Sequence, residues 1–323
     1  PAPFRHPARR PVVVEEIAGQ GRFVFLTMFD WTLHKGWDVL LRAFLEAFEE
    51  TDDALLVLKV WSTMGYRPEQ IPEQAAEFAR RELGHDLLAD PRIRFLQERL
   101  DSEGLIALHQ ASDAFVLPSR GEGWGRPYME AMACGLPVVG TDWSGNTAFM
   151  TRENSYLVDC QVVPVPQAGW REIPTYRGHR WAEPDLAQVR QCLRRVYEER
   201  SEAAEVGRRA QEEIGERFNP VAVGHLIAAE VERARESRRP HPAVVPPATI
   251  PKARATRSSS PHAKAKVQAA DPVRVRWEGA QFVWHSLAHV NREFCLGLTG
   301  ADGVELSVVP SEPFHFSPGE DPR

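Results

Sequence analysis

The sequence predicts an α/β protein built on a doubly wound parallel sheet with helices on both faces. Short apolar runs, each long enough for one strand, alternate with longer segments whose apolar residues recur at helical spacing. The apolar runs are nearly uninterrupted, which is typical of strands that are covered on both sides. Regular alternation of strands and helices favours parallel pairing, because each return crossing then carries a helix.

The predicted strands and helices follow one another from residue 23 onward. The strands are expected at residues 23–28, 55–60, 93–96, 114–117, 137–141 and 156–158. Helices are expected at residues 37–48, 69–88, 102–111, 127–134, 184–199, 201–218 and 221–235. Pro127 suits a first helical position, and Gly135 can adopt the left-handed conformation that ends a helix. Residues 181–185 are interpreted as the start of the helix at 184–199, with Pro184 in its first turn.

Composition divides the chain into four parts. Residues 1–20 are polar and rich in proline, so they are expected to be an irregular lead-in, and 21–235 form the α/β domain. Residues 236–271 are rich in Pro, Ala, Ser, Lys and Arg and cannot bury a core, which predicts a disordered basic linker. Residues 272–323 contain a strand at 273–277, a helix at 286–298 and a strand at 304–309. One β-α-β unit is too small to be stable alone, so we expect the partial start of a second domain.

Charge and cysteine content exclude several classes of protein. The net charge of −6 argues against general nucleic-acid binding, and the basic linker is better explained as a solvated tether than as a contact for nucleic acid or anionic lipid. No apolar run is long enough to cross a bilayer, and no secretory signal opens the chain. The 4 cysteines are scattered without metal-binding or disulfide spacing, which suits a reducing compartment and predicts no metal site. The chain begins with proline, which suggests a segment of a longer polypeptide.

The loops that follow the strands are the places to look for a ligand site, because parallel sheets bind ligands beyond the carboxyl ends of their strands. The loop at 118–126 is rich in glycine and enters a helix. Gly121, Gly123 and Gly125 let the backbone approach a ligand closely, and the helix start favours an anion such as phosphate. Glu122 lies in the loop, and Glu130 lies about one turn into the helix. Carboxylates suit the hydroxyl groups of sugars.

The stretch from Glu122 to Val138 resembles the signature of the family 4 (group 1) glycosyltransferases. Two glutamates with seven residues between them are followed by Ala-Met-Ala-Cys-Gly-Leu-Pro-Val. The resemblance covers residues 23–235 and implies the donor half of a GT-B fold, in which two Rossmann-like domains face each other. It implies that Glu122 contacts the donor sugar and Glu130 the ribose hydroxyls. It also implies that backbone N–H groups of Gly123 and Trp124 lie near the transferred sugar. Taken singly, either glutamate could be a solvated surface residue.

A second segment, His34-Lys35-Gly36-Trp37, resembles the part of the family that binds the donor diphosphate. Lys35 would neutralise the departing diphosphate, although a plain exposed lysine at a helix start is the alternative. Many family members have an arginine five residues earlier, where this chain has Asp30. Lys59 and Arg126 are candidates to supply the missing positive charge.

The resemblance predicts a retaining glycosyltransferase that moves a sugar from a nucleoside diphosphate sugar to an acceptor hydroxyl, with no cofactor or metal. Two alternatives stay open: a catalytically silent module that binds the sugar nucleotide, and a nucleotide-sugar epimerase of the same fold. Expected partners are the donor, a glycan or lipid-linked acceptor and the missing acceptor domain of the parent chain. The resemblance also implies a cytoplasmic location, with peripheral membrane association as a further expectation, and nucleic acid is not an expected partner. Residues 273–279 and 285–293 resemble the opening of an acceptor domain, although Asn291 and Arg292 suit an ordinary helix surface equally well.

Overall fold

The computed structural model describes residues 11–236, 273–279 and 304–310. It divides into two compact units, Pro1–Asn219 and Pro220–Arg323. The first unit contains every residue that the sequence places in the donor site.

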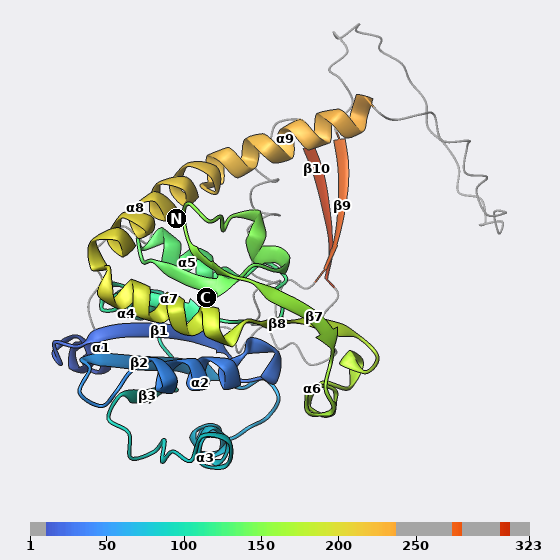
Figure 1. The fold of residues 1–323 in the computed structure, drawn as a ribbon. Coiled ribbons are helices and arrows are strands. Elements are labelled where there is room, and N and C mark those ends of the chain that lie inside the picture. Colours follow the sequence, from blue (N-terminus) through green and yellow to red (C-terminus); the bar gives the residue numbers. More distant parts are fainter. Residues whose placement is uncertain (1–10, 237–272, 280–303, 311–323) are drawn as a thin grey trace, which may run out of the picture. The chain divides into compact units, whose positions relative to one another are not determined.

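The first unit is built on a six-stranded sheet with the order β3-β2-β1-β4-β5-β6, and every neighbouring pair is parallel (Figure 1). This is the doubly wound, Rossmann-like arrangement that the sequence predicts. The strands are β1 (Phe23–Asp30), β2 (Ala54–Trp61), β3 (Ile93–Leu96), β4 (Ala114–Leu117), β5 (Val138–Thr141) and β6 (Tyr156–Val158). β4 and β5 are buried along their whole length, and β1 and β2 at all but their last residue, as uninterrupted apolar runs require.

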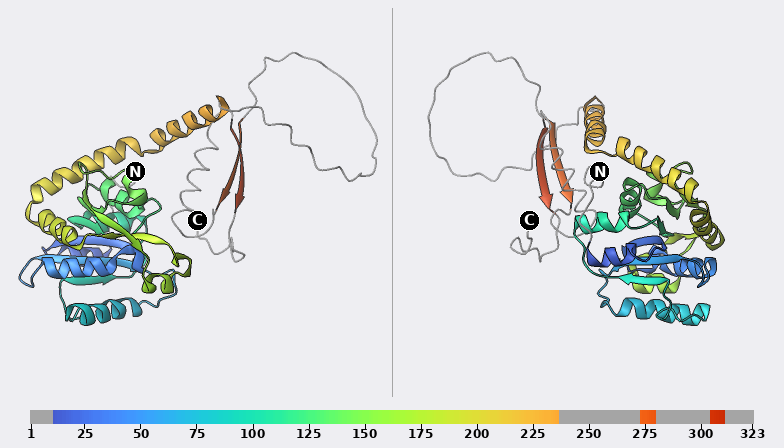
Figure 2. Two further views of the ribbon diagram at one scale, coloured as in Figure 1. Left: turned by 45° about the vertical axis from the view of Figure 1, so that its right-hand side comes forward. Right: turned by 90° about the vertical axis from the view of Figure 1, so that its left-hand side faces the viewer.

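Helices lie on both faces of this sheet (Figures 1 and 2). The helix α2 packs against α3 and α7, α5 packs against α8, and α1 packs against α4. The helices of this unit are α1 (Val12–Ala18), α2 (Trp37–Ala47), α3 (Gln70–Leu83), α4 (Ser102–Gln110), α5 (Arg126–Ala133), α6 (Gln167–Glu172), α7 (Leu186–Glu198) and α8 (Arg200–Arg217). Short 3-10 helices are η2 (Leu33–Lys35), η3 (Ser144–Ala148) and η4 (Pro174–Tyr176).

Three expectations about local structure are wrong. Residues 12–18 of the expected irregular lead-in form α1, whose Val14 and Ile17 are buried in the core. The helix expected to run to residue 88 ends at Leu83, because Gly84 adopts the left-handed conformation at φ 64°. Pro184 does not begin a helix but ends strand β8, and the side chain of Asp185 caps α7 instead.

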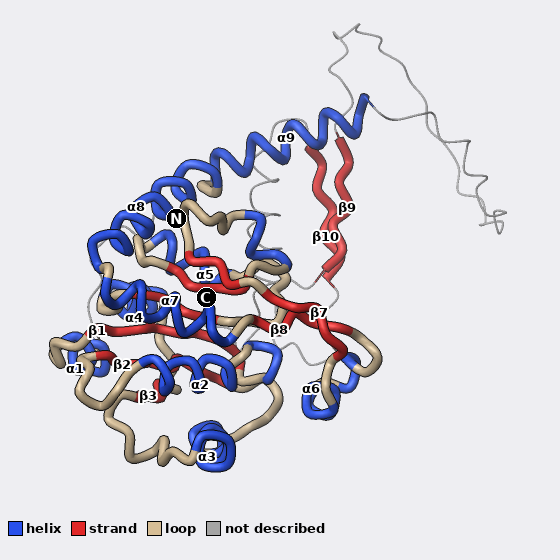
Figure 3. Tube along the Cα trace, in the orientation of Figure 1, coloured by secondary structure: helices blue, strands red, loops and turns tan. Residues whose placement is uncertain are grey.

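A pair of antiparallel strands, β7 (Cys160–Pro164) and β8 (Arg180–Pro184), leaves the sheet after β6 (Figures 1 and 3). Residues 160–184, which include α6 and η4 between the two strands, are called the β7–β8 excursion below. None of these elements is predicted from the sequence.

The second unit contains α9 (Pro220–Glu236), β9 (Val273–Gly279) and β10 (Val304–Pro310). β9 and β10 pair in parallel, with Val273 opposite Val304, so both predicted strands are present. The linker at 237–271 and the helix expected at 286–298, with Asn291 and Arg292, lie outside the described residues. The sequence places residues 220–235 in the donor domain, whereas the structure groups α9 with the second unit. In the described parts of the chain, no helix combines the length and apolar character that a membrane span requires.

The contact between α8 and the end of α5 gives a test of this packing. A Cβ added at Gly207 would lie 2.2 Å from the carbonyl oxygen of Gly135, a backbone atom that cannot move aside cheaply. We expect Gly207→Ala to lower the free energy of unfolding by about 1–3 kcal/mol, the usual cost of overpacking. Urea unfolding followed by tryptophan fluorescence measures it. Gly121→Ala is the control, because a Cβ there meets nothing within 4 Å. Equal stability of the two variants would contradict this packing.

Candidate functional site

The site lies at the carboxyl ends of β1 and β4. These strands are neighbours in the middle of the sheet, and the chain order reverses between them. Ligands of doubly wound sheets bind at such a switch point, because the loops that leave the two strands diverge there. The loop after β1 carries Lys35, and the loop after β4 carries Glu122.

Gly36 brings the two loops together. It adopts a left-handed φ of 71° between η2 and α2, and a Cβ there would lie 1.9 Å from the carbonyl oxygen of Pro118. Only glycine fits both the conformation and the contact. The backbone N–H of Arg120 also donates to the carbonyl oxygen of His34 at 2.7 Å.

Lys35 and Glu122 form an ion pair across the two loops. The distance between Lys35 Nζ and Glu122 Oε1 is 2.7 Å, although the residues are 87 positions apart in the sequence. The side chains are 17% and 8% exposed, so the pair is mostly shielded from water but still reachable. The structure thus brings together two of the three residues on which the predicted site was built.

The glycine-rich loop is held on its other side by η3. The N–H of Glu122 donates to Ser144 Oγ at 2.8 Å, and the N–H of Gly145 donates to the carbonyl oxygen of Glu122 at 3.0 Å. A Cβ at Gly145 would lie 2.2 Å from the carbonyl oxygen of Gly123, so this contact also needs glycine. Ser144 has a φ of 71°. Among the described residues it is the only non-glycine residue with a positive φ. Strained backbone of this kind concentrates at functional sites.

Glu130 lies on α5 and pairs with Arg126 one turn earlier, at 2.7 Å from Nη2 to Oε1. Gly125, with a φ of 85°, is the N-cap of α5. The N-terminus of α5 therefore adjoins the glycine-rich loop. Within the described residues no recorded contact joins Glu130 to Lys35 or Glu122. The third member of the predicted site is therefore near the same loop but not part of the ion pair.

Arg120 is the residue that the sequence analysis missed and that ties the site together. Its guanidinium, which is only 4% exposed, forms a two-bond fork with Asp38 of α2 at 2.7 and 2.8 Å. It forms a second fork with Glu183 of β8 at 2.8 and 2.6 Å, and it donates to the carbonyl oxygen of Leu33 at 2.6 Å. Although burial alone would lower it, the pKa of Arg120 is raised because both carboxylates stabilise its charge. Its guanidinium carbon also lies 4.8 Å from the ring centre of Trp181. The only sequence signal was an arginine beside the glycine loop.

His34 is neutral at physiological pH. Burial, followed by the charges of Lys35 and Arg120, lowers its pKa from 6.5 to about 3. The hydroxyl of Thr32 donates to the carbonyl oxygen of Asp30 at 3.2 Å, so its oxygen accepts from His34 Nδ1 at 2.9 Å. This hydrogen bond assigns the proton of His34 to Nδ1 and leaves Nε2 as an acceptor.

Asp30 and Lys59 make their contacts with residues other than Lys35 and Glu122. Asp30, at the end of β1, accepts from the backbone N–H of Thr63 at 2.8 Å and from the Thr63 hydroxyl. It therefore fixes the loop after β2.

Lys59 is buried in β2 with its ammonium 5.8 Å from the ring centre of Trp61, and burial lowers its pKa despite the nearby carboxylate of Glu98. No recorded contact of the described residues links Lys59 to Glu122 or Glu130.

Trp124 is 38% exposed and packs against Phe149 and Phe218, with ring centres 5.4 and 5.8 Å away. Its indole thus anchors the glycine-rich loop. Trp143, in the loop after β5, is also exposed.

No three His, Cys, Asp or Glu side chains of the described chain gather in a way that could hold a metal ion.

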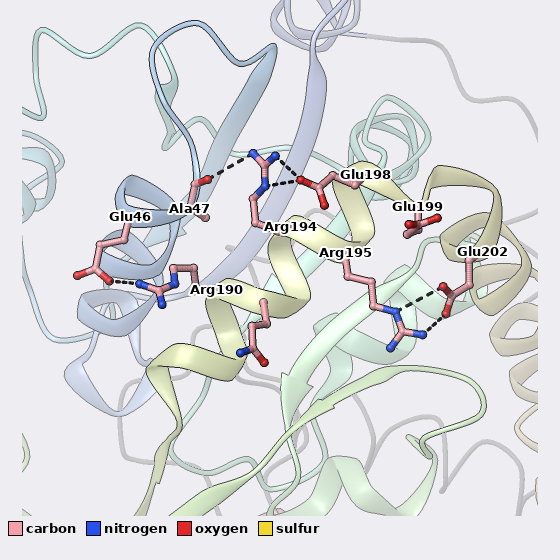
Figure 4. Close-up of a pocket in the computed structure, with 9 residues that line it drawn as sticks. Glu46, Ala47, Arg190, Arg194, Arg195, Glu198, Glu199 and Glu202 are labelled. Carbon is pink, nitrogen blue, oxygen red and sulfur yellow. Dashed lines mark hydrogen bonds and ion pairs between the residues drawn. The ribbon is translucent and has the colours of Figure 1, made fainter.

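A separate hollow of about 620 Å³ lies between the end of α2 and helices α7 and α8 (Figure 4). Arg190, Arg194 and Arg195 line it, but each is already paired with a carboxylate: Glu46, Glu198 and Glu202, respectively. Because α2 runs back toward the start of β2, this hollow lies at the amino edge of the sheet, opposite the Lys35–Glu122 pair. We therefore do not identify it as the donor site.

Comparison with known proteins agrees with this fold. Residues 20–164 match the family model described as "Glycosyl transferases group 1". The D-inositol 3-phosphate glycosyltransferase of Corynebacterium efficiens is 37% identical over 127 residues, which are 39% of this chain and 28% of that protein. The chain thus spans only a little over a quarter of the length of that curated relative.

Two solved structures share the fold over about half of their own length. HepE from Anabaena in complex with UDP-glucose superposes with a TM-score of 0.51 and 19% identity, covering 69% of this chain and 53% of that one. A glycosyltransferase from Rickettsia africae superposes with a TM-score of 0.52 and 16% identity, covering 73% and 54%.

Replacing Arg120 tests whether it holds the site together. Arg120→Met leaves Asp38 and Glu183 without their partner, and we expect the free energy of unfolding to fall by about 2–4 kcal/mol, somewhat less than for a fully buried pair. Chemical denaturation measures the change. The matched control is Arg208→Met on α8, an arginine with two carboxylate partners at the surface, which should change the stability little because water screens exposed ion pairs. A loss at Arg120 no larger than at Arg208 would refute its structural role.

The lowered pKa of His34 predicts a pH dependence of stability. In the unfolded chain His34 takes up a proton as the pH falls below 6.5. In the folded chain it does so only as the pH approaches 3. The stabilisation is therefore complete above pH 6.5 and is lost as the pH falls from there. Between pH 7 and 4.5 we expect the wild type to lose about 1–3 kcal/mol more unfolding free energy than His34→Gln. The exposed His179→Gln is the control and should match the wild type; a His34→Gln profile parallel to the wild type would rule the effect out.

Proposed function

We propose, from the match of residues 20–164 to the model of the group 1 glycosyltransferases, that the first unit binds a nucleoside diphosphate sugar. In this proposal it supplies the donor half of a transfer of the sugar to an acceptor hydroxyl, with retention of the anomeric configuration. The observation that carries the proposal is the 2.7 Å Lys35–Glu122 pair at the switch point of the sheet. Two distant loops there present a cation and a carboxylate together, as a ligand with both phosphate and hydroxyl groups requires.

Lys35 is the proposed partner of the diphosphate. An ammonium group has three N–H donors, and in the structure one of them is used by Glu122. The remaining donors can bind phosphate oxygens without breaking the pair. As the bond to the sugar breaks, negative charge grows on the diphosphate, and a fixed cation stabilises that charge.

Glu122 is the proposed contact for the transferred sugar. One of its oxygens binds Lys35, and the other has no hydrogen-bond partner among the described residues. A free carboxylate oxygen accepts a strong hydrogen bond from a sugar hydroxyl. The N–H groups of Gly123 and Trp124 and the N-terminus of α5 add donors for the phosphate side of the ligand.

Glu130 is proposed to hold the ribose hydroxyls. Its side chain is 17% exposed and points from the first turns of α5, where Arg126 fixes one oxygen. Arg126 is then close enough to the loop to add positive charge for the diphosphate. Lys59 remains a candidate for the same task, although it would have to turn away from Trp61 to reach the ligand.

A catalytically silent donor-binding module is the second candidate, and Asp30 favours it. The position that carries an arginine in many relatives here carries an acid that is occupied by Thr63. Without an arginine at this position, the site has less positive charge beside Lys35 with which to stabilise the leaving group. Release of nucleoside diphosphate that depends on an acceptor would identify the transferase, and binding without release would identify the module.

The remaining expectations belong to the whole protein. A glycan or lipid-linked acceptor, an acceptor domain supplied by the parent chain and a cytoplasmic location, at the membrane periphery, are proposed together with the transfer reaction. Closure of two domains would bring the acceptor to the donor site. The first unit alone should therefore bind the donor better than it transfers the sugar.

Calorimetric titration tests the donor site. We expect Lys35→Ala to weaken binding of the preferred ligand among UDP-glucose, UDP-N-acetylglucosamine and GDP-mannose about 10- to 100-fold, because a charge-assisted contact is lost. Glu130→Gln should weaken binding about 5- to 30-fold through the ribose. Arg81→Ala, on the exposed face of α3, controls for a general change of charge. Full affinity in both site variants, or no binding of any of these donors by the wild type, would contradict the proposed function.

A further inference from the structure

The β7–β8 excursion is attached at several points to the loops that carry Lys35 and Glu122. Glu172, at the end of α6, accepts from the backbone N–H of Leu33 at 2.7 Å. Glu183, in β8, binds Arg120, and the N–H of Ala182 donates to the carbonyl oxygen of Arg120 at 3.2 Å. The excursion therefore forms a wall beside the ion pair rather than a free loop, although no strand of it joins the main sheet.

Tyr176, the last residue of η4, lies on the side of the excursion that faces this site. Its ring meets the ring of His34 edge to face, with centres 5.8 Å apart, and His34 directly precedes Lys35. Hydrogen bonds from the N–H of Tyr176 to Ile173 and from His179 to the carbonyl oxygen of Tyr176 fix its backbone. Its side chain is partly exposed, and its hydroxyl has no hydrogen-bond partner among the described residues.

The surroundings of Tyr176 keep its hydroxyl protonated. Burial raises its pKa, and the negative charges of Glu122 and Glu172 raise it further. The influence of Glu122 agrees with the ring contact in placing Tyr176 near the carboxylate that is proposed to bind the sugar. A protonated phenol both donates and accepts hydrogen bonds, whereas a carboxylate only accepts.

We propose that Tyr176 is a specificity-determining residue of the donor site, whose hydroxyl contacts a hydroxyl group of the transferred sugar. A sugar hydroxyl between the two side chains would donate to Glu122 and accept from Tyr176. A site with both partners discriminates strongly against a sugar that lacks this hydroxyl, because the polar groups would be left unpaired. This inference rests on the proposed function, and it assigns the excursion a role in choosing the sugar.

The test compares a sugar nucleotide with the bare nucleotide. Tyr176→Phe keeps the ring against His34 and removes only the hydroxyl, so the fold should be retained. We expect it to weaken binding of the preferred sugar nucleotide about 5- to 20-fold in calorimetric titration. Its affinity for the corresponding UDP or GDP should stay within about two-fold of the wild type, because the bare nucleotide lacks the sugar. Tyr197→Phe, on α7 at the other edge of the sheet, is the matched control and should change neither affinity.

The possible outcomes separate this inference from the proposal on which it rests. If the wild type binds a sugar nucleotide and Tyr176→Phe binds it equally well, Tyr176 is not a specificity residue and the donor site stands. An equal loss for the sugar nucleotide and the bare nucleotide would show that Tyr176 acts only by supporting the Lys35 loop, which also overturns the inference. If the wild type binds no sugar nucleotide, the proposed function itself fails.

Discussion

The arrangement of the site depends on one buried cation, Arg120. Its two forks bind Asp38, at the start of α2, and Glu183, on β8, while its backbone belongs to the loop after β4. Three segments far apart in the sequence are thereby fixed around one guanidinium. A planar group with five donors can satisfy two carboxylates at once, which a lysine could not do. The position of Glu122, two residues later, follows from this anchor and from the contact of the loop with Ser144.

The structure combines a rigid frame with a site whose charges neutralise each other. Glycine at positions 36 and 145 allows backbone contacts between loops that no larger residue permits. Within that frame Lys35 and Glu122 satisfy one another before any ligand arrives, so neither charge is left unpaired in the shielded site. A ligand with an anionic part and hydroxyl groups adds contacts to both without separating them. The acidic Asp30 limits the positive charge that remains for a diphosphate.

The sequence predicts the central sheet well because its strands are long or uninterrupted apolar runs. β3, β4 and β6 begin and end at the predicted residues, and the link between Lys35 and Glu122 follows from the position of both loops at the carboxyl edge. The β7–β8 excursion was missed because its strands are polar on one side and contain prolines. Pro184 in particular is typical of a first helical turn, although here it ends a strand. Arg120, Asp38 and Glu183 have no shared local pattern, since ion pairs over such distances in sequence are determined by the folded chain alone.

The most direct measurement is a crystal structure of the chain with a bound nucleoside diphosphate sugar. The account predicts that the diphosphate lies between η2 and the glycine-rich loop, with a phosphate oxygen within hydrogen-bond distance of Lys35 Nζ and the sugar beside Glu122. A diphosphate bound instead among the arginines of α7 at the amino edge of the sheet, with the Lys35–Glu122 pair untouched, would contradict it.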